Sequence, residues 1–275
     1  MTTAAVTRTT VQPVTFRRLV TSEHVKMRSL RSTWWALAVA VAFFPLFSAM
    51  RTSSMVAVAA DASPEYLVGP VYVTSGLALA QLVLCGLAVV TITAEYRTGQ
   101  VRSTLTAAPT RLPALGAKLL VVVVTALATG LVGVLVGWAA AAPTLGAARM
   151  TVDLTQAEHL RLMFGVPLYL AAITAFAFGV GAILRSSAAG IASVLGLVFV
   201  VEPAFSYVPW APLQQIATYL PTAAGSRLIS SDTMGSVIAG SQSTTLSAWQ
   251  GYGVLLAWAA AALLVAAVLL RRRDA

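Results

Sequence analysis

Charged residues are scarce in this sequence. Only 10% of its 275 residues are Asp, Glu, Lys or Arg, whereas 58% are hydrophobic. In a soluble domain about a quarter of the residues are charged, and a much smaller share does not cover the surface of a water-soluble fold of this size. The composition therefore excludes a soluble protein and predicts an integral membrane protein.

Acidic residues are scarcer than basic ones, 9 against 18, which gives a formal net charge of +9. In a soluble protein this excess would indicate a nucleic-acid partner. The apolar composition argues against nucleic acid as a partner, so the question becomes where along the chain the positive charge lies.

Cysteine and nucleotide-binding motifs are also lacking. The single cysteine, Cys85, excludes an intramolecular disulfide and a metal site built from cysteines, and its place in an apolar run predicts a packed thiol. The phosphate-binding motif G-x-x-x-x-G-K-[ST] does not occur. We therefore expect no ATPase site and no bound cofactor in this chain.

Six apolar stretches are long enough, or nearly so, to cross a membrane, which requires about 20 mostly apolar residues. They are Trp34–Met50, Val71–Thr93, Leu119–Ala142, Leu162–Leu184, Ala188–Val201 and Trp249–Leu270. The first is short and either extends backwards from Trp34 or is thin, and the fifth is expected to continue through Pro203 toward Tyr207. No predicted span has a charged residue between its ends.

The basic residues orient these spans, because cytoplasmic segments are enriched in Lys and Arg. With the N-terminus inside, the cytoplasmic segments hold 14 of the 18 basic residues, and six of the nine acids lie outside. We therefore expect both termini in the cytoplasm. The polar tail before Trp34 favours a signal anchor over a cleaved signal peptide.

The predicted fold is an all-α membrane protein with six transmembrane helices. Its expected parts are a disordered tail (1–12), an amphipathic interfacial helix (13–33), a transmembrane domain (34–270) and a basic cytoplasmic tail (271–275). Within the transmembrane domain, a cytoplasmic loop (94–118) and an outer segment (202–248) interrupt the spans.

The segment 13–33 has an apolar stripe on one helical face, with basic residues beside it. Lys26, Arg28 and Arg31 flank the stripe, as in a basic helix lying on the inner membrane surface. Anchoring the topology would by itself account for these cations. Glu23 lies in the middle of the apolar arc, where a carboxylate needs a partner: Lys26, the helix bundle or another protein.

The loop 94–118 is punctuated by glycine and proline. Val101, Leu105 and Ala108 recur at helical spacing and predict a short helix roughly parallel to the membrane, which Pro109 ends. Glu95 is placed at the water–lipid boundary. The loop is either a solvated basic connection or a docking element, and its punctuation favours docking.

The outer segment 202–248 contains several aromatic residues and prolines, which suit a partly re-entrant segment buried against protein. Glu202, at the outer end of the fifth span, is either a gate residue or a hydrated helix end, and we favour the hydrated end. Gln81, Thr91 and Thr174 are candidate linings of a route through the bundle, although each could equally be satisfied within its own helix.

Glycines mark the third predicted span. Gly130, Gly133 and Gly137 include a G-x-x-x-G pair, which is typical of close helix packing.

The predicted spans contain no ionisable pair for hydrolysis and no midplane charge of the kind that ion-driven carriers keep. An intramembrane enzyme is therefore not expected. If the chain moves a solute uphill, the energy must arrive from another polypeptide through the cytoplasmic face, at the segments 13–33 and 94–118.

Three stretches resemble bacterial ABC-transporter permeases of the type-2 exporter class. SEHVKMRSLRSTWWAL (22–37) resembles the helix that precedes their first span, and ITAEYRTGQVRSTLTAAPTRLPALGAKLLV (92–121) resembles their first cytoplasmic loop. LPTAAG (220–225) resembles a stretch of their last outer loop, and the predicted topology matches over essentially the whole chain.

The resemblance implies a permease of the bacterial cell membrane that forms a homodimer or heterodimer and binds a separate ATPase subunit carrying ATP and magnesium. It implies a coupling helix in the first loop, with candidate coupling residues Glu95, Tyr96, Arg97, Gly99, Val101, Arg102 and Leu105. Gln100 departs from the family, which more often has a small hydroxyl residue there. Such proteins export drugs, antibiotic peptides, lipids or polysaccharides.

A function from a different class remains open. A non-transporting membrane sensor or immunity protein would bind a ligand at the outer segment and would need no ATPase partner.

Overall fold

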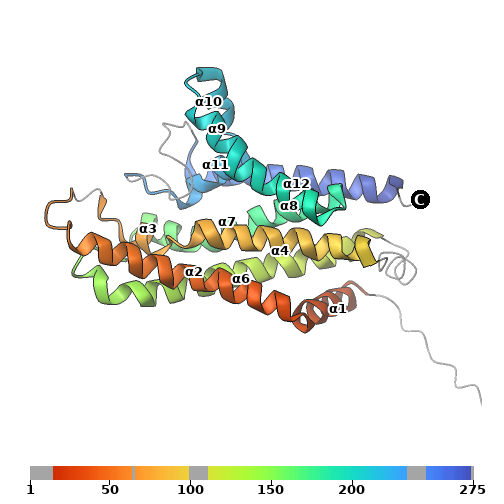
Figure 1. The fold of residues 1–275 in the computed structure, drawn as a ribbon, viewed down its shortest axis with the longest axis horizontal. Helices are drawn as coiled ribbons and strands as arrows, with labels where there is room; N and C mark the ends of the chain where they lie inside the picture. Colours follow the sequence, from red (N-terminus) through yellow and green to blue (C-terminus); the bar gives the residue numbers. More distant parts are fainter. Residues whose placement is uncertain (1–14, 64–65, 99–110, 234–245, 274–275) are drawn as a thin grey trace, which may run out of the picture.

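The computed structural model describes residues 15–63, 66–98, 111–233 and 246–273. Within these residues the chain is helical and contains no strand; one isolated β-bridge joins Val68 and Thr151. Figure 1 shows an elongated bundle whose long helices run roughly side by side.

Six of the helical segments are long and apolar enough to cross a membrane. They are α2 (Arg31–Val56), α4 (Leu77–Thr98), α6 (Arg111–Leu145), α7 (Ala157–Leu184), a composite segment that begins with α8 (Ser187–Gly196), and α12 (Ala248–Arg273). The six predicted spans are confirmed, and the protein has the build of a multi-pass helical membrane protein.

Shorter helices precede or connect these segments. They are α1 (Phe16–Ser29), α3 (Gly69–Val73), α10 (Ala211–Ala217), α11 (Pro221–Gly225) and the 3-10 turn η3 (Ser226–Ile229). Only Leu30, in an extended conformation, separates α1 from α2. The first span thus extends backwards from Trp34 to Arg31, which was one of the two alternatives predicted for it.

The fifth span continues beyond Val201, as predicted. After α8 the chain passes through one π-helical stretch, η2 (Leu197–Val201), and then α9 (Glu202–Tyr207). Pro203 is the second residue of α9, directly after the π-helical stretch, and its missing N–H removes one hydrogen bond from this otherwise continuous segment.

The second span begins later than predicted, at Leu77 instead of Val71. The residues from 69 to 73 form the separate helix α3, whose end is marked by the Thr74 N–H donating to the Pro70 carbonyl over 3.0 Å. Gly76 follows, and a Cβ atom there would overlap the backbone of Phe43 and Phe44. The chain therefore turns before α4 so that it can pass close to α2.

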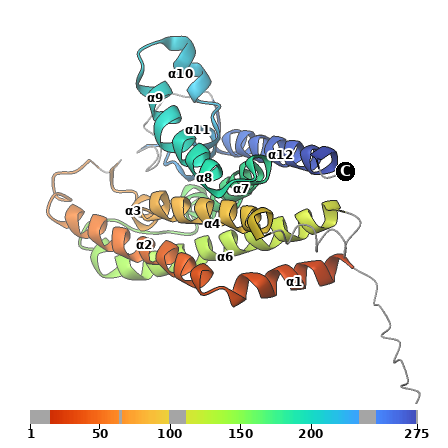
Figure 2. The same ribbon diagram turned by 45° about the vertical axis from the view of Figure 1, so that its right-hand side comes forward.

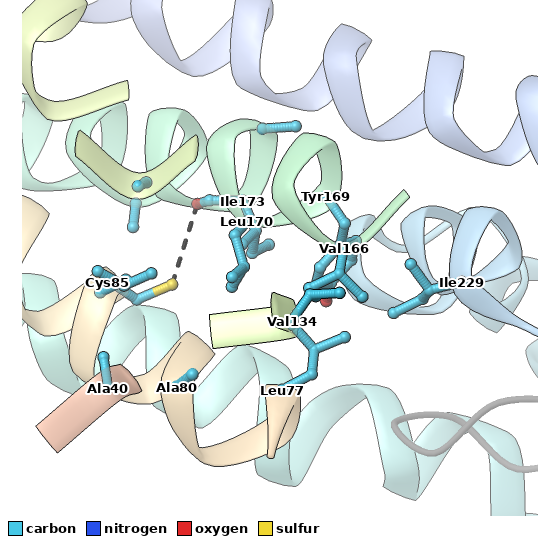
Figure 3. Close-up of a cluster of buried hydrophobic side chains, with 14 of the residues drawn as sticks. Ala40, Leu77, Ala80, Cys85, Val134, Val166, Tyr169, Leu170, Ile173 and Ile229 are labelled. Carbon is cyan, nitrogen blue, oxygen red and sulfur yellow. Dashed lines mark hydrogen bonds between the residues drawn. The ribbon is translucent and has the colours of Figure 1, made fainter. Parts of the chain in front are cut away.

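Helix α7 occupies the middle of the bundle. It packs against α4, α6 and α12, and 83% of the residues in its most apolar stretch are buried. Figure 3 shows Cys85 of α4 in this core, with its thiol 4.0 Å from the carbonyl oxygen of Ile173. The prediction of a packed thiol is confirmed.

The glycines of the third span lie at helix crossings. A Cβ on Gly133 would overlap the Phe44 ring of α2, and one on Gly130 would lie 2.8 Å from the Pro167 Cα of α7. Close packing between helices, as predicted from the G-x-x-x-G pair, accounts for these glycines.

The two ends of the bundle differ. Figures 1 and 2 place α1 and the C-terminal ends of α4 and α12 at one end, here called the α1 end, and α3 at the opposite end, here called the α3 end. In both views the segment from α8 to α10 tilts away from the other helices.

Candidate functional site: an ion quartet at the α1 end

Four charged side chains from three helices meet at the α1 end. They are Glu23 and Lys26 of α1, Glu95 of α4 and Lys118 of α6, here called the ion quartet. The Lys118 ammonium lies 2.6 Å from Glu23 Oε2 and 2.8 Å from Glu95 Oε1. The Lys26 ammonium lies 2.6 Å from Glu23 Oε1 and 3.4 Å from Glu95 Oε1.

The amphipathic face of α1 explains how Glu23 reaches the quartet. Met27, one turn further along the same face, is buried, and Phe16 lies where it would contact a Cβ on Gly116 of α6. The apolar stripe of α1 thus packs onto the start of α6 and carries Glu23 inwards. The partner that the sequence required for Glu23 is Lys26 together with Lys118.

The quartet is charge-balanced, with two carboxylates and two ammonium groups. Burial alone would raise the pKa of Glu23, but attraction to Lys118 and Lys26 outweighs it and lowers this pKa below its ordinary value of 4.5. Burial would likewise lower the pKa of Lys26, but the carboxylates of Glu23 and Glu95 outweigh it and raise this pKa above 10.5. Both shifts favour the charged forms.

Lys26 and Lys118 are the only two lysines in the sequence, which has 18 basic residues in all. An ammonium group donates hydrogen bonds in three directions from one point, whereas a guanidinium is a planar fork. A site in which one cation contacts two carboxylates from different helices therefore suits lysine.

The other predicted residues of the interfacial helix lie outside the quartet. Arg28 and Arg31 are exposed, and the Arg28 carbonyl accepts a hydrogen bond of 2.9 Å from the Trp34 indole. That bond links the end of α1 to the start of α2.

The predicted coupling residues are described only in part. Tyr96 lies in α4, where the guanidinium of Arg185 stacks 4.8 Å from the centre of its ring. Arg97 belongs to the last turn of α4. The predicted short helix, with Gly99, Val101, Arg102 and Leu105, lies outside the described residues.

Glu95 and Lys118 stand on the two sides of that segment, one near the end of α4 and the other in the first turns of α6. Their contact of 2.8 Å closes the base of the loop, and Glu23 attaches α1 to the same point. The segments 13–33 and 94–118, both predicted to lie at the cytoplasmic face, therefore meet in one cluster.

The candidate route-lining residues each make separate contacts. Thr91 donates to the Leu87 carbonyl of its own helix over 2.7 Å. Gln81 is buried and accepts a 2.6 Å hydrogen bond from the Tyr169 hydroxyl of α7. Thr174 is also buried in α7, and among the described residues its hydroxyl has no hydrogen-bond partner.

Glu202 is buried, with 4% of its surface exposed, so the interpretation as a hydrated helix end is wrong. Its two carboxylate oxygens accept hydrogen bonds from the backbone N–H groups of Thr222, at 3.0 Å, and Ala223, at 2.7 Å. These are the free N–H groups of the first turn of α11, which a carboxylate satisfies. Glu202 therefore ties the fifth span to the outer segment.

A line of buried polar groups continues from there. A Cβ on Gly225 of α11 would lie 3.0 Å from the Tyr169 ring, so α11 packs directly on this tyrosine. Tyr169 in turn bonds Gln81 of α4. Tyr169 thus contacts both Gln81 of the second span and α11, whose first turn Glu202 binds, so these buried polar side chains lie close together around α11.

A second set of contacts fixes the outer segment at the α3 end. Arg161 of α7 donates to the carbonyls of Arg227, Leu228 and Ser230 at 3.0 to 3.1 Å and pairs with Asp232 at 2.9 Å. Glu158, one turn earlier, accepts from the Asp232 N–H at 2.9 Å. Residues 227–232 of the outer segment are therefore bound to the first turns of α7.

Sequence reasoning missed Lys118, Tyr169 and Arg161. The signal for Arg161 was its spacing from Glu158, an acid and a base three residues apart at the start of a span. The signal for Lys118 was its rarity as one of two lysines. No feature of the sequence distinguished Tyr169 from the other aromatic residues.

No known protein family and no curated protein sequence matches this chain. The fold therefore defines the class, a multi-pass helical membrane protein with six candidate spans. Across the described ranges, no group of three or more His, Cys, Asp or Glu side chains could hold a metal ion.

Proposed function

We propose that this chain is the membrane-spanning permease subunit of an ATP-binding-cassette exporter in the bacterial cytoplasmic membrane, with both termini in the cytoplasm. It acts as a transport subunit and not as an enzyme. ATP and magnesium bind to a separate ATPase subunit that docks at the α1 end. The exported substrate is a drug, an antibiotic peptide or a lipid.

The ion quartet is the observation that carries this proposal. A force applied to the loop between α4 and α6 acts on Glu95 and Lys118 at its base, and these side chains also contact Glu23 and Lys26 of α1. Because ion pairs between helices couple their positions, a partner that moves the loop moves α1, α4 and α6 together. A coupling site requires this mechanical link.

Two further features support transport at a dimer interface. The first half of the composite fifth span, α8, packs on α4 and α7, but from η2 onward the span leaves the bundle, with Phe199 and Val200 48% and 64% exposed. An apolar helix left uncovered in this way suits packing against a second permease copy. The buried polar residues Gln81, Tyr169 and Glu202 lie around α11 and are the candidate lining of the transport route.

Co-purification tests the partner. A cassette ATPase encoded beside this chain should remain bound to it through detergent extraction. A non-transporting sensor or immunity protein predicts the opposite: no bound ATPase, and resistance that survives when the neighbouring ATPase is inactivated.

Glu95→Ala tests the coupling site. We expect normal membrane insertion and continued ATP hydrolysis by the complex, but loss of efflux of a fluorescent amphiphilic dye from proteoliposomes. Normal efflux by this variant would overturn the assignment of Glu95.

Two matched controls sharpen that experiment. Asp61→Ala removes an exposed acid between α2 and α3, outside the ion quartet, and should leave the dye efflux per ATP unchanged. Glu23→Ala removes the other carboxylate of the ion quartet. If it uncouples as strongly as Glu95→Ala, the quartet acts as a unit, whereas uncoupling by Glu95→Ala alone indicates direct contact with the ATPase.

A further inference from the structure

A groove of about 620 Å³ opens between α1, α2 and the first half of α6. Its lining comprises Val20, His24, Met27, Arg28, Thr33, Trp34, Leu37, Val41, Leu120, Val121, Val124, Thr125, Ala128, Thr129 and Val132. None of these residues belongs to the ion quartet.

The groove has an apolar wall and a cationic mouth. The walls are mostly Val, Leu, Ala and Met side chains of α2 and α6, whereas the α1 side supplies the exposed side chains of Arg28 and His24. The one acid of α1, Glu23, is bound by Lys118 and Lys26 and so does not neutralise the mouth.

The geometry of the groove matches the edge of a bilayer. Helix α1 is amphipathic and precedes a spanning helix, so it lies at the level of the lipid headgroups, and α2 and α6 descend from it into the acyl region. Trp34, an interfacial residue type, forms part of the rim, and its bond to the Arg28 carbonyl fixes the corner between α1 and α2.

We propose that this groove is a binding site for an anionic phospholipid. The phosphate of the headgroup contacts Arg28 and His24, and one acyl chain lies along α6 beside Val124 and Ala128. The cationic mouth suits the phosphate of a lipid headgroup, and the apolar walls suit its acyl chain. A guanidinium binds a phosphate particularly well. The site requires neither an ATPase partner nor transport, so it stands independently of the function proposed above.

Quenching of Trp34 fluorescence tests the proposal. The full chain is reconstituted in vesicles that contain phosphatidylcholine and phosphatidylglycerol at one fixed ratio, with brominated acyl chains on only one lipid at a time. The sequence has 6 tryptophans, so the Trp34 component is obtained as the difference from Trp34→Phe. Per mole of brominated lipid, we expect phosphatidylglycerol to quench Trp34 about fivefold more effectively than phosphatidylcholine. This factor corresponds to the attraction of one cation for an anionic lipid.

Two pairs of variants locate the effect. Arg28→Gln should abolish the preference, whereas Arg31→Gln, which removes an equal charge outside the lining, should retain it. Ala128→Phe fills the groove and should reduce quenching by both lipids, whereas Ala139→Phe, at an exposed position of α6 away from the lining, should not.

Equal quenching by the two brominated lipids would overturn the proposal. So would an equal loss of preference in Arg28→Gln and Arg31→Gln, because that result would indicate attraction to the general surface charge. Unchanged quenching in Ala128→Phe would show that no acyl chain occupies the groove.

Discussion

At the scale of single residues, Lys118 is the centre of the ion quartet. Its side chain is 7% exposed and touches carboxylates from two other helices, whereas Lys26 is 44% exposed. Removing one member of a buried charge cluster leaves the opposite charges desolvated and unpaired, which is far more costly than losing an exposed pair.

We therefore expect Lys118→Ala to destabilise the protein by about 3 kcal/mol, and Lys26→Ala by about 1 kcal/mol or less. Lys118→Arg should recover only part of the loss, because a planar fork cannot replace an ammonium between two helices. Thermal unfolding in detergent measures all three. Equal destabilisation by the two alanine substitutions would contradict the burial argument.

The same cluster predicts a dependence on pH. Because the pKa of Glu23 is lowered when folded, its contribution to stability is complete above its ordinary value of 4.5 and is lost as the pH falls through the lowered pKa. The pKa of Lys26 is raised, so its contribution is complete below 10.5 and is lost as the pH rises through the raised pKa.

The measurement is the difference in thermal midpoint between the wild type and Glu23→Gln. This difference should be constant around neutral pH and shrink below about pH 4.5. A difference that stays unchanged down to pH 3 would mean that folding does not lower the pKa of Glu23.

At the scale of helices, the crossing of α6 over α2 depends on the absence of a side chain. Gly133 faces the Phe44 ring, and a larger residue must push the two helices apart because packed interiors have little free space. Gly86 of α4 differs, since nothing lies within 4 Å of a Cβ built there.

Gly133→Leu should therefore lower the thermal midpoint, since overpacking a helix contact costs about 1–3 kcal/mol. Gly86→Leu adds the same side chain to another spanning helix and should have little effect. Size-exclusion chromatography and thermal unfolding of the two variants compare them directly. Tolerance of both substitutions would exclude a tight α2–α6 crossing.

Connections between elements also set the shape of the outer segment. Glu202 holds the start of α11, while Arg161 holds η3 and the residue that follows it. Both anchors are charged groups bound to backbone atoms, so they fix the path of the chain and not only its side chains. The outer segment therefore moves with α7 and the fifth span.

At the scale of the whole molecule, the sidedness of the protein can be tested with thiols. Cys85 is buried, so it should react little with a thiol reagent, and the labelling will report the introduced cysteines. Ser29 at the end of α1 and Ala157 at the start of α7 are exposed and lie at opposite ends of the bundle.

With the termini in the cytoplasm, a membrane-impermeant maleimide should label Ala157→Cys in intact cells. The Ser29→Cys thiol should react only after the membrane is opened, because the excess of basic residues at that end retains it inside. Labelling in the reverse pattern would refute the predicted orientation.

The sequence by itself determined the number of spans and nearly all of their positions. The length of an apolar stretch is a local property of the chain, and it decides directly whether the stretch can cross a bilayer. The six predicted stretches are accordingly six helices. The second span began at Leu77 and not at Val71 because Gly76 passes against the backbone of α2, which apolar length does not report.

Only the tertiary structure decided which side chains became partners. The position of Glu23 on an apolar face required a partner, but the choice of Lys118 arose from the packing of α1 on α6. Likewise, the place of Glu202 at the outer end of the fifth predicted span favoured a hydrated helix end, while its actual partners are backbone N–H groups of α11. Partition into a membrane depends on what each segment contains, whereas pairing depends on which segments meet.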